Sequence, residues 1–473
     1  MRSLLAVLLA GSALSCSGES RPARRVVLVS VDTLRADHMS LHGYGRDTTP
    51  ELARLAAEDG VVFERCYAQS SWTLPSHMSM LTGLYPITHG VNSDDKRLAR
   101  NVVTLAERLR EAGFATAAFT DGGYVASGWG LEDGFQEYHD DRLGAVEGDS
   151  GLARILPHAE RWLREHRAQD TFLFLHTYEV HAPYAEAEPW ISHFETESPP
   201  PAEDVERLEY LRGLGDSEEY ELDRFEGLQH LQATYDGLIL RADQRLGRLF
   251  ALLRELGIYD ETLIVVTSDH GESFLDSGVY AGHGLLLTEA ETRVPLVVKF
   301  PGNRFAGARS DALVESVDIA PTVLHALRVA PGAWAGPGHD LALLLEGKLE
   351  PRPHAFSFGA GLQSFAVRSP RWTLLEPVSE ETAERILLER LEPDDPERVR
   401  VRLLHERRLE PTGTSCEPNE LAQHPDVEAR LVEAYAAWEF AQYVRIHERG
   451  QAAEGREALD ERELERLRAL GYL

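Results

Sequence analysis

The sequence is poor in cysteine, in long hydrophobic runs and in positive charge, and each shortage excludes a class of protein. Only three cysteines occur in 473 residues, and Cys66 and Cys416 belong to no CxxC pair, which argues against a zinc knuckle. Beyond the N-terminal segment there is no run of about 18 apolar residues, so we expect no membrane-spanning helix there. Lysine and arginine number 48 against 78 aspartates and glutamates, a net charge of −30. Such a surface repels nucleic acid, so a site for an anion needs local positive charge from a metal ion, a histidine or a helix N-terminus.

The N-terminal residues have the pattern of an export signal. Arg2 precedes the apolar run Leu4–Leu9, and small residues then lead to Cys16. The four residues ALSC that end at Cys16 resemble a bacterial lipobox, in which this cysteine would carry the lipid; plain signal cleavage beside an incidental cysteine is the alternative. We therefore predict a lipoprotein of the periplasm or cell envelope, otherwise a secreted protein, that touches a membrane only through a lipid anchor at Cys16. In such a compartment Cys66 and Cys416 could form a disulfide, and the sequence leaves that open.

Apolar runs that alternate with helical segments predict an α/β fold. The predicted buried strands are Val26–Val31, Val61–Phe63, Phe114–Phe119, Thr171–Leu175, Leu263–Thr267 and Val294–Phe300. The helices predicted between them, each closed by a glycine, are Glu51–Asp59, Leu105–Ala112 and Glu226–Glu255. This alternation predicts a large mixed, mostly parallel sheet flanked by helices, in which ligands lie beyond the carboxyl ends of the strands.

The character of the sequence changes near residue 350, where Pro351 and Pro353 mark a boundary. The short strands expected after it are Ala355–Phe358 and Ser364–Val367, and the charged helices are Asp426–His447 and Leu459–Leu470. We therefore predict four parts of the chain. They are a lipoprotein-type signal peptide over 1–15, a linker over 16–24, a catalytic domain over 25–350 with an acidic surface insertion over 199–221, and a smaller C-terminal α+β subdomain over 351–473.

Two strand ends carry residues suited to a metal ion. Asp32 directly follows a buried strand, where a carboxylate is costly unless it is paired or bound to metal; capping of the following turn is the alternative. Asp269 and His270 follow another buried strand, and a hard oxygen beside an imidazole suits Zn²⁺, Mn²⁺ or a mixed-ligand Ca²⁺ site. Gly271 permits a sharp turn, and Glu272 is expected to orient His270. A purely structural turn is the alternative.

Thr73 is the candidate nucleophile. Pro75 and Gly83 bracket a predicted helix, which places Thr73 at or beside its N-terminus. Free backbone N–H groups and the helix dipole favour an oxyanion or an alkoxide there. A divalent cation would lower the pKa of the hydroxyl further, enough for it to act. The alternative is that Thr73 only caps the helix.

Three histidines on loops at strand ends are candidate acids or anion ligands. His176 and His181 follow the strand that begins at Thr171, and His283 stands between two glycines a short loop beyond Asp269. Such histidines can protonate a leaving group or hold an anionic oxygen. Taken singly, each has a packed or exposed histidine without a chemical role as the alternative.

In their order along the chain these segments resemble the sulfatase family of the alkaline phosphatase superfamily, over roughly Arg25 to Leu327. The segments that carry the resemblance are VSVDTLRADHMSLHGYG, TTPELARLAAEDGVVFERCYAQSSWTLPSHMSMLTGLYP, LHTYEVHAPY, TSDHGES with GHG, RVPLVVKFPG and VDIAPTVLHAL. The resemblance implies one divalent metal ion, Ca²⁺, Mn²⁺ or Zn²⁺, held by Asp32, Asp269 and His270, with the Thr73 oxygen completing the site. It also implies that His181 assists departure of the leaving group, with His283 as a competing candidate that contacts the substrate.

The chain departs from the usual pattern of this family around the anion. Most sulfatases have C-x-P-S-R, whose cysteine becomes formylglycine; here the position is Thr73, which cannot be converted, and the arginine is His77. The second aspartate of the usual pair is Thr33, and the usual Lys-x-His is Gly122-x-Tyr124. We therefore expect His77, Tyr124 and His176 to contact the substrate.

The nucleophile favours phosphorus chemistry. A formylglycine hydrate can expel sulfate by collapsing to the aldehyde, whereas a sulfated Thr73 has no such route. Water can cleave a phosphothreonine at phosphorus, and Thr73 is similar to the nucleophile of phosphodiesterases and phosphoglycerol transferases in the same superfamily. The prediction is a metal-dependent hydrolase of a small anionic ester or a glycan- or lipid-linked ester, with a phosphomonoester, a phosphodiester or phosphoryl-group transfer favoured. The alternatives are a sulfatase that acts without formylglycine and a catalytically weak binding protein on the same fold.

Overall fold

The computed structural model describes residues 24–140, 151–184, 189–195, 198–213, 225–276, 281–331, 336–359, 364–376, 407–413, 419–449 and 453–455. The predicted signal peptide, Cys16, Cys416 and the predicted helix Leu459–Leu470 lie outside these residues. Within them, no helix combines the length and the apolar character needed to cross a membrane.

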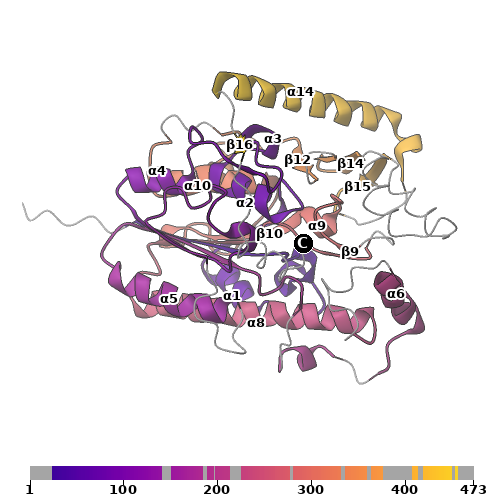
Figure 1. Cartoon of the computed structure of the whole chain (residues 1–473), viewed down its shortest axis with the longest axis horizontal. Helices are drawn as coiled ribbons and strands as arrows, with labels where there is room; N and C mark the ends of the chain where they lie inside the picture. The colour runs from indigo at the N-terminus through magenta and orange to yellow at the C-terminus, as the bar shows by residue number, and fades with distance from the viewer. Residues whose placement is uncertain are drawn as a thin grey trace, which may run out of the picture.

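A single eight-stranded sheet forms the centre of the molecule (Figure 1). Its strands, in spatial order, are β11 (Ala308–Glu315), β2 (Val61–Tyr67), β10 (Arg293–Lys299), β7 (Thr262–Thr267), β1 (Arg25–Val31), β6 (Thr171–Thr177), β4 (Ala115–Phe119) and β5 (Glu137–His139). Strand β10 runs antiparallel to both neighbours, and the other neighbouring strands are parallel. This confirms the predicted mixed, mostly parallel sheet.

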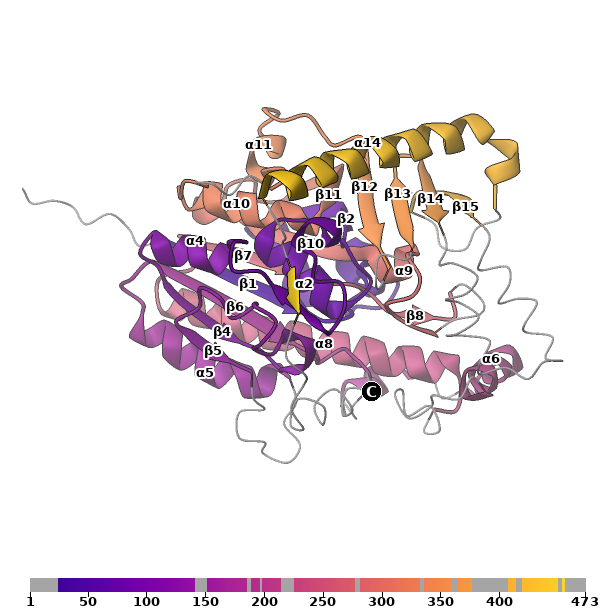
Figure 2. The ribbon, with the colours of Figure 1, turned by 45° about the horizontal axis from the view of Figure 1, so that its top comes forward.

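Helices cover both faces of the sheet, as Figures 1 and 2 show. One layer contains α1 (Pro50–Glu58), α5 (Leu152–Glu165) and α8 (Leu228–Glu255), and the other contains α2 (Thr73–Thr82), α4 (Leu105–Glu111) and α10 (Ile319–Ala326). Strand β1 lies between them, with Val27 and Val29 in one hydrophobic core and Val26 and Leu28 in the other. Burial on both faces explains why this strand is an almost continuous apolar run.

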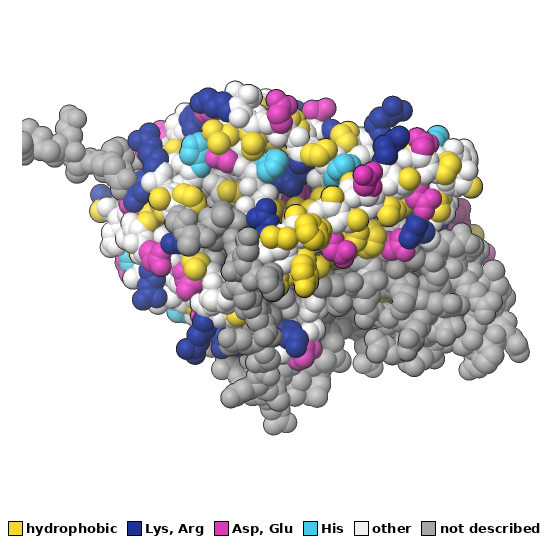
Figure 3. Space-filling view, turned by 90° about the horizontal axis from the view of Figure 1, so that it is seen from above, with side chains coloured by type: hydrophobic (Ala, Val, Ile, Leu, Met, Phe, Trp, Pro, Cys, Tyr) yellow, Lys and Arg dark blue, Asp and Glu magenta, His cyan; other side chains and the backbone are white. Residues whose placement is uncertain are grey.

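A smaller antiparallel sheet follows in the chain. Its strands are β12 (Ala355–Phe358), β13 (Phe365–Arg368), β14 (Trp372–Glu376) and β15 (Arg408–Pro411), and helix α14 (Pro425–Arg449) packs against it. Buried Arg352 forms ion pairs with Glu315 and Asp318, which ties this unit to the end of β11. In α14, Phe440 is 69% exposed and Tyr443 is 64% exposed. The face of the molecule seen in Figure 3 has groups of hydrophobic side chains among charged ones.

Two predicted segments differ from the structure. Strand β2 continues beyond Phe63 to Tyr67, because Cys66 and Tyr67 return to the core after the half-buried Glu64 and Arg65. The acidic segment contains helix α6 (Ala202–Gly213), which lies against α8, and its residues 214–221 are outside the described part. Cys66 is a free, buried thiol in β2.

A buried histidine outside the candidate site predicts a pH dependence of stability. His89 ends the short helix α3 (Pro86–His89); its Nδ1 accepts a hydrogen bond from the Val91 N–H at 3.1 Å, and its Nε2 lies 3.2 Å from Ser79 Oγ. Burial lowers the pKa of His89 to about 3, below the unfolded value of about 6.5. The unfolded chain therefore takes up this proton first as the pH falls. The stability from neutral His89 is complete above about pH 6.5 and is lost toward pH 3.

We expect the free energy of unfolding to fall more steeply with decreasing pH in the wild type than in His89→Gln. The extra slope approaches about 1.4 kcal/mol per pH unit between about pH 6 and pH 4, measured by urea denaturation at several pH values. His193→Gln, which replaces an exposed histidine, serves as the control and should keep the wild-type slope. Parallel curves for the wild type and His89→Gln would contradict the assignment.

Candidate active site

Three predicted metal ligands meet at the carboxyl edge of the sheet. Asp32 follows β1, and Asp269 and His270 follow the neighbouring parallel strand β7. One ligand atom from each of the three lies within 4.8 Å of the others, and all three side chains are fully buried. The His270 Nε2 atom lies 3.4 Å from Asp269 Oδ2 and 3.9 Å from Asp32 Oδ1.

The backbone around the cluster is shaped to hold these side chains. Thr33 adopts a positive φ of 55°, which costs roughly 1–2 kcal/mol for a residue other than glycine. Its carbonyl accepts a 2.6 Å hydrogen bond from the Tyr235 hydroxyl, which secures this turn directly after Asp32. On the other side, a Cβ on Gly271 would lie 2.0 Å from the Ala290 carbonyl oxygen, so the turn after His270 requires glycine.

The donor set fits a divalent cation. Asp32 Oδ1 and Asp269 Oδ2 are buried without a hydrogen-bond partner among the described residues. Burial raises the pKa of Asp32 well above its usual range, and repulsion from Asp269 raises it further. Burial likewise raises the pKa of Asp269. Two carboxylates at this distance are stable together in the ionised form when a cation neutralises them.

His270 is held with the tautomer that a cation requires. Its Nδ1 donates to the Gly271 carbonyl oxygen at 2.8 Å, so Nε2 of the neutral ring keeps its lone pair and faces the carboxylates. Glu272, which the sequence predicted to orient His270, instead places Oε1 3.1 Å from His283 Nδ1 and Oε2 3.3 Å from the Tyr184 hydroxyl. That prediction is wrong because the backbone of Gly271 itself satisfies His270 and the turn points Glu272 at the next loop.

Thr73 lies at the start of α2, beside this cluster. It is the first helical residue; the residue before it, Trp72, is the N-cap and makes no side-chain capping bond. The Thr73 hydroxyl lies 3.1 Å from His270 Nε2 and also interacts with the Asp32 carboxylate. Ser76 donates a 2.6 Å hydrogen bond to the Asp269 carbonyl, which fixes the first turn of α2 against the end of β7. The hydroxyl therefore stands where the helix N-terminus and the acidic cluster meet.

Two buried histidines form a layer behind these groups. His176 Nε2 donates to Asp32 Oδ2 at 3.1 Å. His77 Nδ1 donates to the Thr73 carbonyl at 2.9 Å, and its Nε2 lies 3.0 Å from Ser30 Oγ. These contacts show that both rings support the cluster, and their contact with a substrate stays a prediction.

The other two histidines stand side by side near His270. The rings of His181 and His283 are 5.0 Å apart, and those of His270 and His283 are 4.6 Å apart. The Nδ1 atom of His181 hydrogen bonds to the Ala182 carbonyl. Burial lowers the pKa of His181 to about 3 and that of His283 to about 4. Both rings are therefore neutral near pH 7.

Tyr124 lies on the loop after β4 and contacts the residue that precedes Thr73. Its ring contacts the Trp72 ring edge to face, with centroids 4.9 Å apart, and its backbone N–H donates to the Tyr178 hydroxyl at 3.1 Å. Sequence reasoning missed both Trp72 and Asp121. Asp121 Oδ2 accepts hydrogen bonds from the Thr177 hydroxyl and the Tyr178 N–H, both at 2.9 Å, and so anchors the loop that leads to His181. The same signal that singled out Asp32, a carboxylate at a strand end, was present for Asp121.

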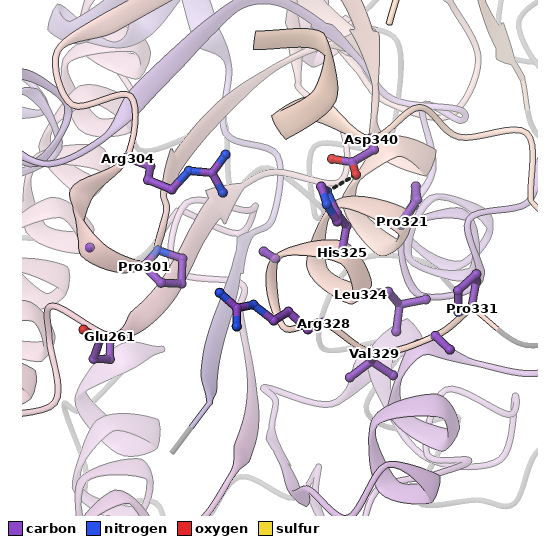
Figure 4. Close-up of a pocket in the computed structure, with 13 residues that line it drawn as sticks. Glu261, Pro301, Arg304, Pro321, Leu324, His325, Arg328, Val329, Pro331 and Asp340 are labelled. Atoms are coloured by element: carbon purple, nitrogen blue, oxygen red, sulfur yellow. Dashed lines mark ion pairs between the residues drawn. The ribbon is translucent and has the colours of Figure 1, made fainter. Parts of the chain in front are cut away.

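A large cavity lies away from this cluster. It has a volume of about 910 Å³, and its walls include Glu261, Arg304 and Arg328 (Figure 4). Glu261 immediately precedes β7, whereas Asp269 follows β7, so the cavity is at the opposite end of that strand. The volume of a cavity therefore does not identify the candidate site, which is identified by the chemistry of its side chains.

Comparison with known proteins agrees with the architecture. The Sulfatase family model matches residues 24–329, and the chain therefore belongs to the sulfatase family. At this level it is a hydrolase of ester bonds.

The relatives include enzymes named for different esters. The multifunctional alkaline phosphatase superfamily protein PehA of Trinickia caryophylli is 28% identical over 64% of this chain and 73% of its own length. A sulfatase of Formosa agariphila is 25% identical over 63% of this chain and 68% of its own. Among solved structures, the phosphonate monoester hydrolase from Silicibacter pomeroyi superposes with a TM-score of 0.66 at 20% identity, over 92% of this chain and all of that one. The last similarity establishes the fold alone.

Proposed function

We propose that this chain hydrolyses phosphoesters, or transfers their phosphoryl group, with Thr73 as the nucleophile. The observation that carries the proposal is the position of the Thr73 hydroxyl, at the N-terminus of α2 and between Asp32 and His270. Threonine cannot be converted to formylglycine, so the route by which a formylglycine hydrate expels sulfate is closed to it. The names of the relatives include a phosphonate monoester hydrolase and several sulfatases, so they are compatible with an ester of phosphorus or of sulfur.

The acidic cluster would hold one divalent cation through Asp32, Asp269 and His270, with the Thr73 oxygen as a further ligand. When bound, such a cation neutralises charge on the ester and lowers the pKa of the nearby hydroxyl. Ca²⁺, Mn²⁺ and Zn²⁺ all suit this mixture of carboxylate and imidazole ligands. Arg35 is buried and forms ion pairs with Asp37 and Asp276, so its positive charge is already neutralised by these two carboxylates.

The covalent steps conserve atoms and protons. Thr73 Oγ1 attacks phosphorus, a bond from Oγ1 to phosphorus forms, and the bond to the leaving oxygen breaks. The hydroxyl proton can return to the leaving oxygen through the neutral imidazole of His181, with His283 as the competing carrier. Water then attacks the phosphothreonine at phosphorus, the bond to Oγ1 breaks, and the proton lost by the water restores the Thr73 hydroxyl as phosphate or its ester is released. His77 and His176 keep Thr73 and Asp32 in place, and we infer that they also contact the anion.

Assay of three substrates with a common leaving group tests the choice of ester. We expect p-nitrophenyl phosphate or a p-nitrophenyl phosphodiester to turn over at least about tenfold faster than p-nitrophenyl sulfate, a difference of about 1.4 kcal/mol in activation free energy. Each substrate is measured with Ca²⁺, Mn²⁺ and Zn²⁺ in turn. Faster hydrolysis of the sulfate would instead establish a sulfatase that acts without formylglycine. Binding of metal without turnover of any ester would favour the remaining hypothesis, a catalytically weak binding protein on this fold.

We further propose that the protein is exported and carries a lipid at Cys16. The proposal rests on the N-terminal apolar run and the lipobox-like sequence before Cys16. Mass spectrometry of the mature N-terminus decides between a lipid-modified Cys16 and plain signal cleavage. A mature chain that begins elsewhere without lipid would refute the anchor.

A further inference from the structure

A half-buried tryptophan stands beside the proposed nucleophile. Trp72 directly precedes Thr73, and part of its side chain reaches the surface, whereas Asp32, Asp269 and His270 are fully buried. Part of the ring packs against the hydrophobic core on the α2 side of the sheet. The rest is an apolar surface next to the residue that carries the proposed nucleophile, where contact with a ring of a ligand would stabilise it.

Two loops approach this residue. The Tyr124 ring meets the Trp72 ring edge to face at 4.9 Å, with an angle of 79° between the planes. The loop that carries His283 is also close, since a Cβ on Gly284 would lie 3.9 Å from Trp72 Cβ. The tryptophan therefore neighbours both the Tyr124 loop and the His283 loop.

The loop that carries Tyr124 is connected to His176 and His181 through Tyr178. It is 4% exposed and packs on Trp129 at 5.6 Å as well as on Trp72. The Tyr178 hydroxyl accepts its backbone N–H, and the Tyr178 ring lies edge to face against His176 at 4.6 Å and His181 at 5.1 Å. The aromatic pair thus has a set orientation relative to the reacting groups, which a ring-binding surface needs.

The direction of attack decides which part of a substrate this surface meets. In an in-line displacement the leaving oxygen departs on the side of phosphorus opposite the nucleophile. Trp72 is bonded to the nucleophilic residue, and in the proposed mechanism His181 or His283 delivers a proton to the leaving oxygen. A ring beside the nucleophile is nearer to a substituent that stays on phosphorus than to the departing oxygen.

We propose that Trp72, supported by Tyr124, is a subsite for an aryl group retained on phosphorus. This inference rests on the proposed phosphoester hydrolysis and deepens it. A phosphomonoester has no retained carbon substituent, so the subsite selects phosphodiesters or phosphonate monoesters that carry a flat apolar ring. Stacking on an indole contributes about a five- to tenfold preference for such a ring.

The test compares two phosphonate esters with the same leaving group and the same charge. The substrates are p-nitrophenyl phenylphosphonate and p-nitrophenyl methylphosphonate. We expect the wild type to prefer the phenyl compound about five- to tenfold in kcat/KM, mainly through a lower KM. Trp72→Leu should reduce this ratio to about one by raising KM for the phenyl ester more than for the methyl ester. Trp72→Phe, which keeps a ring, should restore most of the preference.

Trp190→Leu is the matched control, because Trp190 is also half-buried but packs near α8. It should retain the wild-type ratio. An unchanged ratio in Trp72→Leu would overturn the subsite. If the ratio is unchanged because kcat/KM falls equally on both esters, Trp72 serves the packing of α2 instead.

Direct binding separates the subsite from the reaction. Calorimetric titration with phenylphosphonate and methylphosphonate measures the ring preference without turnover. If the wild type hydrolyses neither ester but binds phenylphosphonate at least about fivefold tighter, and Trp72→Leu loses this difference, the subsite stands and the proposed function fails. Equal affinities in the wild type would overturn the subsite whether or not the esters are hydrolysed.

Discussion

Thr73→Ala is expected to lower turnover of the preferred ester by at least about a thousandfold while leaving metal content unchanged. The substitution removes the hydroxyl that lies 3.1 Å from His270 Nε2 but keeps Asp32, Asp269 and His270. Alanine is also a good helix former, so the first turn of α2 is retained. The measurement is kcat with the best p-nitrophenyl ester, together with metal analysis of the purified variant.

Two variants of the same helix make this result specific. Thr73→Ser keeps a hydroxyl and should retain part of the activity. Thr82→Ala makes the identical change at the other end of α2, where the Thr82 hydroxyl donates to the Met78 carbonyl and accepts from the Leu84 N–H, and should remain active. Full activity of Thr73→Ala would end the proposal that Thr73 is the nucleophile. Loss of metal in the same variant would show that its oxygen is needed chiefly as a ligand.

Asp269→Asn is expected to lose the divalent cation and, with it, nearly all activity. The substitution preserves the shape of the side chain and removes the negative charge that attracts and neutralises a bound cation. In the metal-free protein the same change relieves repulsion between two buried carboxylates, since burial raises the pKa of both and Asp269 raises that of Asp32 further. Metal analysis after dialysis, and melting temperature with and without added cation, measure both effects.

The expected pattern is a cation-dependent rise in melting temperature for the wild type and none for Asp269→Asn. Asp121→Asn is the control, because Asp121 is also nearly buried near the site but binds the Thr177 hydroxyl and the Tyr178 N–H. It should keep its metal. Unchanged metal content in Asp269→Asn would refute the ligand assignment.

Much of the fold was predictable because it follows local patterns. Strands β1, β6 and β7 are continuous apolar runs buried on both faces, and a glycine follows closely after each of the predicted helices between strands. The placement of Asp32 and of Asp269 and His270 also followed from sequence, because the carboxyl ends of parallel strands share one edge of a sheet. The extension of β2 to Tyr67 was missed, since Glu64 and Arg65 interrupt its apolar run.

The partners of individual side chains depended on contacts between distant segments. The sequence placed Glu272 beside His270, yet the turn at Gly271 directs it to His283. It contained no sign that Trp72 would meet Tyr124, because the two residues approach only when α2 and the loop after β4 fold onto the same side of the sheet.

The sequence by itself determined the family resemblance, the mixed sheet, and the residues that we propose as cation ligands and nucleophile. These are properties of residue type, order and local periodicity. The tertiary structure decided which atoms meet: the hydroxyl of Thr73 with His270 and Asp32, His283 with Glu272, and Trp72 with Tyr124. The reason is physical, since hydrogen bonds and ring contacts form over distances of a few ångströms that residue spacing along the chain does not specify.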